Sequence, residues 1–217
     1  MRSLTLLLAV ATVSLASADT PTKEYKLDSE VTTLSPDKSF VIKQYFKPDD
    51  SMIYGQKRQI WIFPPSGNNG YLLPYKKDQS GAAAWFDFSP NSRWICLGDK
   101  ICAGSGTVNL YHRDHGIHFS PVSDKPLGDD AWKFFAQQTG IKPEQIPNVH
   151  KDVSFDGWRD NHYLILSLSG LHFFDLGSSN DRWRVDYWKC AYDLNENKFI
   201  LLPDLSRRNK GKIYFLK

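Results

Sequence analysis

Half of the six histidines lie within seven residues, His112-Arg113-Asp114-His115-Gly116-Ile117-His118. Imidazole and carboxylate groups are ligands for zinc and copper, and a hairpin loop would let several of them converge on one ion. The candidate ligands are His112, Asp114, His115 and His118. Their spacing matches no closed zinc pattern and lacks the helical pair of metalloproteases. An exposed polar turn explains the same residues, so we expect no bound metal and keep a metal-assisted hydrolase as the alternative function.

A second polar and aromatic stretch runs from Asp156 to His162, and a third, Asp181-Arg182-Trp183-Arg184, resembles it in composition. Tryptophan and arginine are enriched at the energetic centres of protein interfaces. The sequence therefore predicts a binding surface. An alternative is a turn whose tryptophan covers the edge of the core while the arginine stacks on it. The candidate binding residues are Trp158, Arg159, His162, Trp183 and Arg184.

Patterns that define catalytic sites are absent from the sequence. Ser105 is not in a G-x-S-x-G nucleophile elbow, and there is no phosphate loop or dinucleotide fingerprint. The adjacent acids Asp49-Asp50 and Asp129-Asp130 need not face one cleft, as glycoside hydrolysis would require. We expect no catalytic residue and no cofactor.

The first 18 residues have the pattern of an export signal. Arg2 precedes a mostly apolar run from Leu4 to Leu15, and Ala16-Ser17-Ala18 is a small-residue cleavage site. Such a run is too short to span a bilayer, although an uncleaved anchor is the alternative. No later stretch is long and apolar enough to cross a membrane. We expect export to the periplasm or the extracellular space after cleavage near Ala18.

Composition favours one β-rich domain over residues 19–217. The chain has 7 Trp, 10 Tyr and 13 Phe but only 2 Met, and large aromatic residues suit half-buried sheets. The formal net charge is +3, and the only basic cluster is a short one at Arg207, Arg208, Lys210 and Lys212. This pattern does not predict nucleic-acid binding.

Three cysteines in an exported chain suggest one disulfide and one leftover thiol. If Gly98-Asp99-Lys100 were a hairpin loop, Cys96 would face Cys102 at a separation that a disulfide can bridge. The alternative is two reduced, buried cysteines. We predict the Cys96–Cys102 disulfide and a buried Cys190.

Three stretches share a common order: an extended run, a turn and an apolar strand. The turns are Ser35-Pro36-Asp37, Ser89-Pro90-Asn91 and, with a different sequence, Phe155-Asp156-Gly157. Pro and Asp or Asn suit the second and third positions of a β-turn. A further pair of apolar strands around a polar loop follows each turn, so each repeat contains four strands. The repeats span about 31–75, 83–123 and 152–204.

Four-stranded units at this spacing are typical of β-propeller blades. Leu34-Ser35-Pro36-Asp37 and Phe88-Ser89-Pro90-Asn91, each followed by a strand and a segment like Ile60-Trp61-Ile62-Phe63, resemble TolB-type and WD-repeat-like blades. The resemblance implies an all-β, propeller-like array of about three four-stranded antiparallel repeats. It also implies a binding surface more than a reaction.

One helix is expected within this array, at about 129–140. Asp129 could cap it and Gly140 could end it, while Trp132 and Phe135 lie on one face. Overall, the sequence predicts an exported, non-catalytic β-repeat module that binds a protein or a cell-envelope component. Closed propellers usually have four or more blades, so the open sheet edges could also pair with a second copy.

Overall fold

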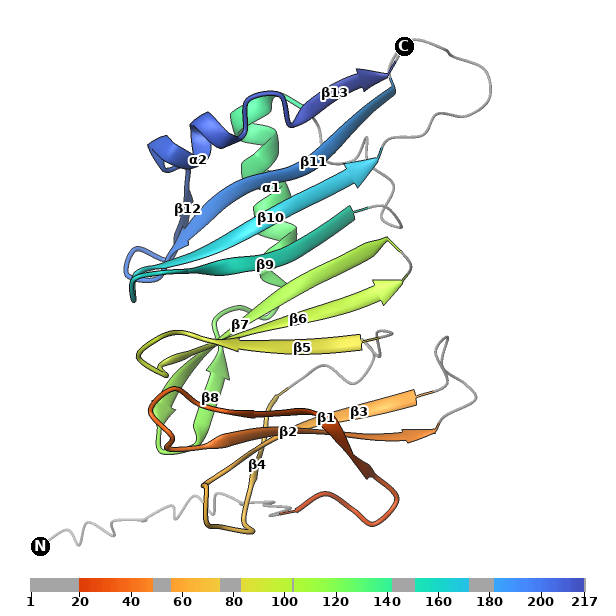
Figure 1. Ribbon diagram of the computed structural model, residues 1–217, viewed down its shortest axis with the longest axis vertical. Coiled ribbons are helices and arrows are strands. Elements are labelled where there is room, and N and C mark those ends of the chain that lie inside the picture. Colours follow the sequence, from red (N-terminus) through yellow and green to blue (C-terminus); the bar gives the residue numbers. More distant parts are fainter. Residues whose placement is uncertain are drawn as a thin grey trace, which may run out of the picture.

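The computed structural model describes residues 20–48, 56–74, 83–102, 104–141, 151–171 and 182–216. These residues form three successive sets of strands, stacked along the long axis of the molecule, and two helices (Figure 1).

The first repeat contains β1 (Lys26–Leu34), β2 (Val41–Pro48), β3 (Gln56–Phe63) and β4 (Tyr71–Leu72). The second contains β5 (Ala83–Phe88), β6 (Trp94–Cys102), β7 (Ser105–His115) and β8 (His118–Pro121). The third contains β9 (Lys151–Arg159), β10 (Tyr163–Leu171), β11 (Arg182–Asp193) and β12 (Lys198–Ile200). Helix α1 (Leu127–Thr139) precedes the third repeat, and α2 (Pro203–Arg208) and β13 (Ile213–Leu216) follow it.

The first repeat is a separate antiparallel sheet in the order β1-β2-β3-β4. The other two repeats share one sheet in the order β12-β11-β10-β9-β7-β6-β5, with β8 added to β7 and β13 to β11. Strands β7 and β9 run parallel and are joined through the pair Gly106 and Asp152, whereas the strands within each repeat are antiparallel. The predicted all-β class, with four-stranded repeats and an inserted helix, is confirmed. The predicted signal peptide, residues 1–18, lies outside the described residues.

Two apolar cores hold the repeats together. The first lies between the first and second repeats, where Phe40 packs edge-on against Phe88 and Phe119 at ring separations of 5.4 and 5.1 Å. The second core is formed by the other face of the second repeat, the third repeat and α1. A single repeat could not bury both of its faces, so stacking supplies each core. A smaller cluster around Ile165 and Leu205 lies beneath α2.

The two Ser-Pro turns have the same hydrogen bonds. In the first, Lys38 N–H donates to Ser35 O, and Ser35 Oγ accepts from Phe40 N and donates to Asp37 Oδ1. The second turn repeats this arrangement with Ser89 as the buried serine and Asn91 as the acceptor. Lys38 and Ser92 occupy equivalent left-handed positions, with φ of 58° and 56°. A β-turn followed by a left-handed residue closes a hairpin, so the predicted turns are confirmed.

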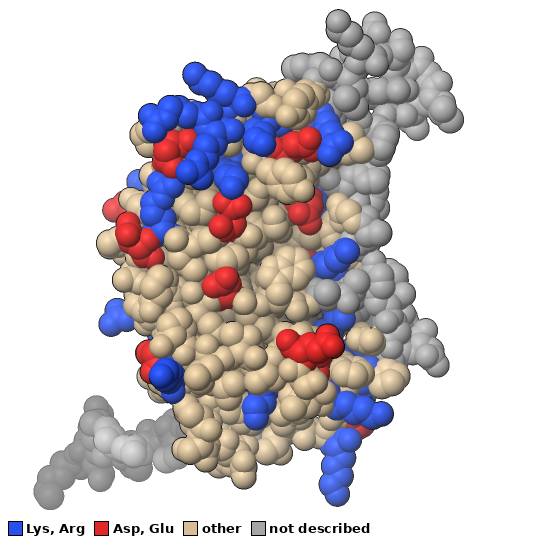
Figure 2. Space-filling model, viewed as in Figure 1, with Lys and Arg blue, Asp and Glu red and all other residues tan. Residues whose placement is uncertain are grey.

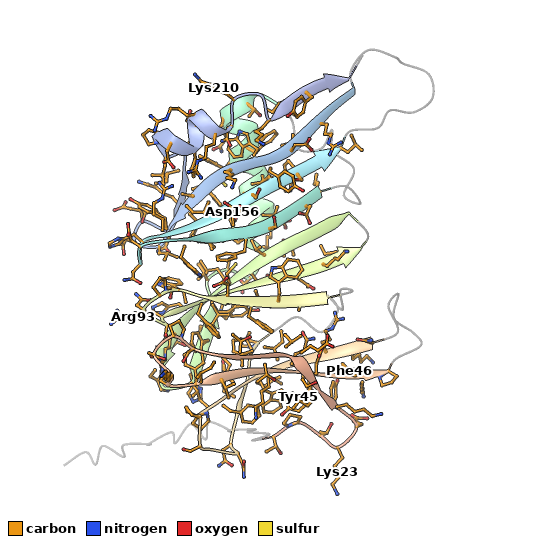
Figure 3. The ribbon with its side chains drawn as sticks, in the orientation of Figure 1. Lys23, Tyr45, Phe46, Arg93, Asp156 and Lys210 are labelled. Atoms are coloured by element: carbon orange, nitrogen blue, oxygen red, sulfur yellow. The ribbon has the colours of Figure 1, made fainter. Side chains whose placement is uncertain are left out.

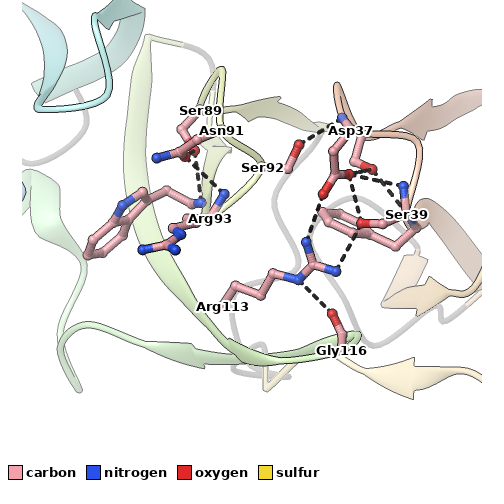
Figure 4. Close-up of polar contacts among 11 residues, drawn as sticks. Asp37, Ser39, Ser89, Asn91, Ser92, Arg93, Arg113 and Gly116 are labelled. Carbon is pink, nitrogen blue, oxygen red and sulfur yellow. Dashed lines mark hydrogen bonds and ion pairs between the residues drawn. The ribbon is translucent and has the colours of Figure 1, made fainter.

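Arg113 on β7 bonds to the first of these turns at the rim of the first core (Figure 4). Its guanidinium donates to Asp37 Oδ2 at 3.0 Å, to Ser39 Oγ at 2.9 Å and to the carbonyl of Gly116 at 2.6 Å. It also lies 4.9 Å from the centre of the Phe40 ring. Asp37 N–H donates directly to Ser92 Oγ in the second turn. The polar rim of the first core is therefore a network that spans two repeats.

Helix α1 covers β7 and β10 and begins two residues before the predicted start. Pro126, not Asp129, is its N-cap, and Asp129 lies in the first turn. The helix ends as predicted at Gly140, whose left-handed backbone (φ 74°) donates to Ala136 O. Trp132 and Phe135 are buried on its sheet-facing side, as predicted.

The third repeat does not turn at Phe155-Asp156-Gly157, contrary to the prediction. Register along β9 shifts between Phe155, opposite Leu166, and Gly157, opposite Ile165, so Asp156 is the extra residue of a β-bulge. The hairpin instead turns at residues 160–162, where Asp160 has φ of 54°. A glycine within a strand marks a bulge as readily as a turn.

The predicted Cys96–Cys102 disulfide is wrong. Strand β6 continues through Gly98-Asp99-Lys100 without a turn, so the two cysteines are separated by about 20 Å along one strand. Gly98 has a different role: the Trp85 ring lies over it, and a Cβ there would lie 2.2 Å from the indole. Cys96 and Cys190 are free and buried. A reduced, buried Cys96 was the alternative to the disulfide, and the prediction of a buried Cys190 is confirmed.

Replacing Asp37 with Asn tests the charged part of the turn network. Burial alone would raise the pKa of Asp37, but hydrogen bonds from Ser39, Ser35 and Arg113 outweigh it and hold the pKa well below its usual range. Such a group stabilises the fold above the unfolded-state pKa, and this stabilisation declines as the pH falls below about 4. We expect Asp37→Asn to lower the free energy of unfolding at pH 7 by about 1 kcal/mol, since solvent screens the half-exposed pair.

Urea denaturation between pH 3 and 7 measures this effect. The variant should also lose part of the acid dependence of the wild-type protein. Asn91→Asp is the matched control, because it adds a carboxylate to the equivalent turn, where the described structure shows bonds to Asn91 Oδ1 from Ser89 Oγ and the Arg93 backbone N–H but none from a guanidinium. Equal stability of Asp37→Asn and wild type at pH 7 would contradict a role for the Asp37–Arg113 pair.

Thiol modification tests the assignment of the cysteines. Burial raises the pKa of Cys96, with a further contribution from the charge of Asp87, and burial raises that of Cys190. The thiolate is the reactive form, so both thiols should resist iodoacetamide in the native state. Both should react after unfolding without a reductant, as peptide mass spectrometry would show. Recovery of a Cys96–Cys102 peptide would contradict the structure.

Candidate functional site

The histidine stretch is divided between two surroundings. His112 lies against Trp94 at a ring separation of 4.5 Å, and its Nδ1 is 3.8 Å from Asp114 Oδ1. His115 and His118 stack at 4.7 Å across the end of the β7–β8 hairpin, and His118 also contacts Tyr71. Across the described part of the chain, no group of three or more His, Cys, Asp or Glu side chains is placed to hold a metal ion.

The predicted binding residues of β9 have structural partners. Trp158 Nε1 donates to Asp87 Oδ1 at 3.3 Å, which ties the third repeat to the second. Arg159 binds Asp204 of α2 through two hydrogen bonds of 2.9 and 2.7 Å. The hydrogen bond from Arg159 lowers the pKa of Asp204 to about 2. Of the three candidates in this stretch, His162 is exposed on the turn.

The five predicted binding residues do not form one surface. Tyr163 of β10 pairs with Arg159, whereas Leu171, at the other end of the same strand, pairs with Arg184. Eight residues of extended chain separate these positions, or about 26 Å. Trp183 pairs through its backbone with Phe215 of β13, at the same end as Arg184. Of the predicted set, Arg184 lines the cleft described next.

A cleft of about 390 Å³ lies where β10 ends and β11 begins, beside the start of β7. Its volume falls within the range of small-ligand sites, about 300–1,000 Å³. We call it the Tyr187 cleft. It is lined by residues 169–171 and 184–187, together with Gly104 and Asp152.

Tyr187 has an unusual backbone in this cleft. Its φ is 53°, in the left-handed region that tyrosine rarely adopts, and its side chain is 62% exposed. The register of β11 shifts here, so that Asp186 and Tyr187 both lie opposite Ser169, and Tyr187 N–H donates to Ser169 Oγ at 3.1 Å. A bulge of this kind redirects a side chain. Strained residues of this type cluster at binding and catalytic sites.

Charged residues of the third repeat occur mostly in pairs. Lys189 Nζ lies 2.6 Å from Asp156, which Figure 3 shows on the broad surface of this sheet. Arg184 Nε bonds to Asp186 at 2.5 Å beside the cleft. Figure 2 shows Lys and Arg gathered at the end of the molecule that carries α2, with acids among them. The surface near the cleft thus offers polar groups without one dominant charge.

Sequence reasoning missed Tyr187, Ser169 and Asp152 as members of one site. Tyr187 follows Asp186 within a run that reads as continuous strand, and no glycine or asparagine indicates the left-handed position. The three residues are brought together only by the pairing of β9, β10 and β11.

No protein-family model matches the chain, and no curated protein sequence is similar to it. Among solved structures, the crystal structure of TolB from Acinetobacter baumannii is similar at 13% sequence identity and a TM-score of 0.36. The similarity covers 78% of this chain and 30% of that one, so the chain spans less than a third of the length of TolB. The relation to TolB is a weak one of fold and says nothing about activity or partners. Neither helix of the described chain has the length and apolar composition needed to cross a bilayer.

Replacing Tyr187 with Gly tests whether its backbone is strained. Glycine adopts positive φ without the steric cost that other residues incur, about 1 kcal/mol. We expect Tyr187→Gly to unfold with a free energy about 1 kcal/mol higher than Tyr187→Ala, which keeps the strain but removes the same ring. Chemical denaturation of both variants measures the difference. A glycine variant less stable than the alanine variant would contradict the strain.

Proposed function

We propose that the chain is an exported, non-catalytic β-repeat module that binds a protein or a cell-envelope component through the Tyr187 cleft. The observation that carries this proposal is an exposed tyrosine in a left-handed conformation beside a cleft. Its exposed ring adds little packing to the fold, so the strain is better explained by a ligand that the ring contacts.

The position of the cleft supports the same function. Its lining residues belong mainly to paired strands of one sheet, and binding groups on such elements are held in place more rigidly than groups on loops. Tyrosine and arginine are also residues that contribute strongly to binding energy. Arg184, a sequence-predicted candidate that lines the cleft, is thus part of the proposed surface.

A metal-assisted hydrolase receives less support. Of its proposed metal ligands, His112 lies against Trp94, whereas His118 contacts Tyr71 and stacks on His115. The sequence also suggested self-association through open sheet edges, and the experiment below distinguishes it from binding of another molecule.

Site-specific photo-cross-linking tests the proposal in the source organism. A benzophenone amino acid is placed at Tyr187 in the full chain and, as a control, at Leu34 of the first repeat, which is also exposed. We expect a discrete cross-linked product from position 187 alone, and less of it when Arg184 is replaced by Ala. Products that are the same at both positions, or absent at 187, would contradict the proposal. A product of twice the chain mass would assign the cleft to self-association instead.

A further inference from the structure

Three residues form a row across the outer face of the third repeat. Asp152 pairs with Ser169, and Ser169 lies opposite the bulge that carries Tyr187. Their neighbours Val153 and Leu168 point into the second core, so Asp152 and Ser169 point to the opposite face. Adjacent strands lie about 4.8 Å apart, so the row spans about 10 Å from β9 to β11. This length is comparable with a short oligosaccharide.

The carboxylate of Asp152 is available to a ligand. Among the described residues, it has no hydrogen-bond partner. Burial raises its pKa, while the charge of Lys100 acts in the opposite direction. The group lies against Gly106, where a Cβ would come within 2.5 Å of Oδ1, so the absence of a side chain there makes room for it. The Asp152 carboxylate is therefore a half-buried hydrogen-bond acceptor to which no described residue donates.

Ser169 and Arg184 provide hydrogen-bond donors on the same side. Ser169 Oγ already accepts the Tyr187 N–H, and its hydroxyl proton can be donated to a ligand. Arg184 uses Nε to bind Asp186, while its terminal nitrogens have no acceptor within the described chain. Its side chain is 54% exposed. The cleft thus combines donors and acceptors a few ångströms apart.

The charges of the cleft do not select a strongly ionic ligand. Arg184 and Asp186 neutralise each other, and Lys100 lies close enough to affect Asp152. A sugar hydroxyl, like that of serine, is both a donor and an acceptor and suits such a mixed set. The exposed Tyr187 ring adds an apolar face, which the C–H groups of a sugar ring can cover.

We infer that the Tyr187 cleft binds a neutral saccharide, with one sugar ring stacked on Tyr187 and hydroxyl groups bonded to Asp152, Ser169 and Arg184. This inference rests on the proposed function and names the chemical class of the cell-envelope component. Ring stacking makes the aromatic character of residue 187 essential and its hydroxyl dispensable.

Titration of the full chain with four trisaccharides tests the inference. Cellotriose, maltotriose, laminaritriose and chitotriose are added separately, and binding is followed by calorimetry and by amide chemical shifts. We expect at least one to bind and to shift the amides of Ser169 and Tyr187. Its affinity should change little with salt, because no ion pair is formed.

Variants assign the contacts. Tyr187→Ala should weaken binding about tenfold, as for an aromatic hot spot, whereas Tyr187→Phe should bind like wild type. Asp152→Asn should weaken binding several-fold, since it replaces an acceptor oxygen with a donor. Leu34→Ala, which alters an exposed apolar residue of the first repeat, is the control and should bind like wild type.

Two results would overturn the inference: no trisaccharide binds, or binding occurs without shifts at the cleft. These results are distinct from failure of the proposed function. If position 187 still yields a specific cross-link to a protein while the trisaccharides are silent, the cleft is a protein-binding site and the saccharide is excluded. If cross-linking at position 187 also fails, both proposals are wrong.

Discussion

The guanidinium of Arg113 joins two hairpins that the sequence places far apart. It reaches from β7 to the carboxylate of Asp37, and the buried serines of both turns keep their neighbouring acceptors in position. Phe40 lies beneath the guanidinium and at the same time fills the first core. The ion pair, the first turn and the first core therefore share neighbouring residues, Arg113, Asp37 and Phe40. In the described part of the chain the two sheets share no strand pairing, so the orientation of the first repeat on the second depends on this network and on the first core.

The second and third repeats are joined in a different way. Their strands belong to one sheet, but α1 fills the core between them, and Gly128 lets its first turn approach closely. A Cβ at Gly128 would lie 2.4 Å from Thr107 Oγ1. The hydrogen bond from Trp158 to Asp87 closes another part of this contact. The inserted helix therefore explains why the spacing between the last two repeats is longer than between the first two.

Local chemistry was enough to predict those parts of the fold whose residues act on their own backbone. Pro36 and Asp37 define a turn whatever surrounds them, and Gly140 ends a helix wherever apolar periodicity stops. Prediction failed where a neighbouring strand decides the outcome. Gly98 was predicted to lie in a loop, but it lies within β6, where the Trp85 ring packs over its backbone. Gly157 was predicted to lie in a turn, but it follows a β-bulge in β9. The cleft was missed for the same reason, since Tyr187 acquires its conformation only from pairing with β10.

Among the described residues, one backbone pair, Gly106 with Asp152, joins the two halves of the large sheet. A parallel contact of this length contributes few backbone hydrogen bonds, so α1 and the second core supply most of the contact between these two repeats. The Tyr187 cleft lies across the same junction, with Gly104 on one side and Ser169 on the other. A ligand bound there would contact both repeats, and its free energy of binding would add to the free energy needed to separate β7 from β9. Ligand binding in the cleft would therefore stabilise the large sheet as one unit.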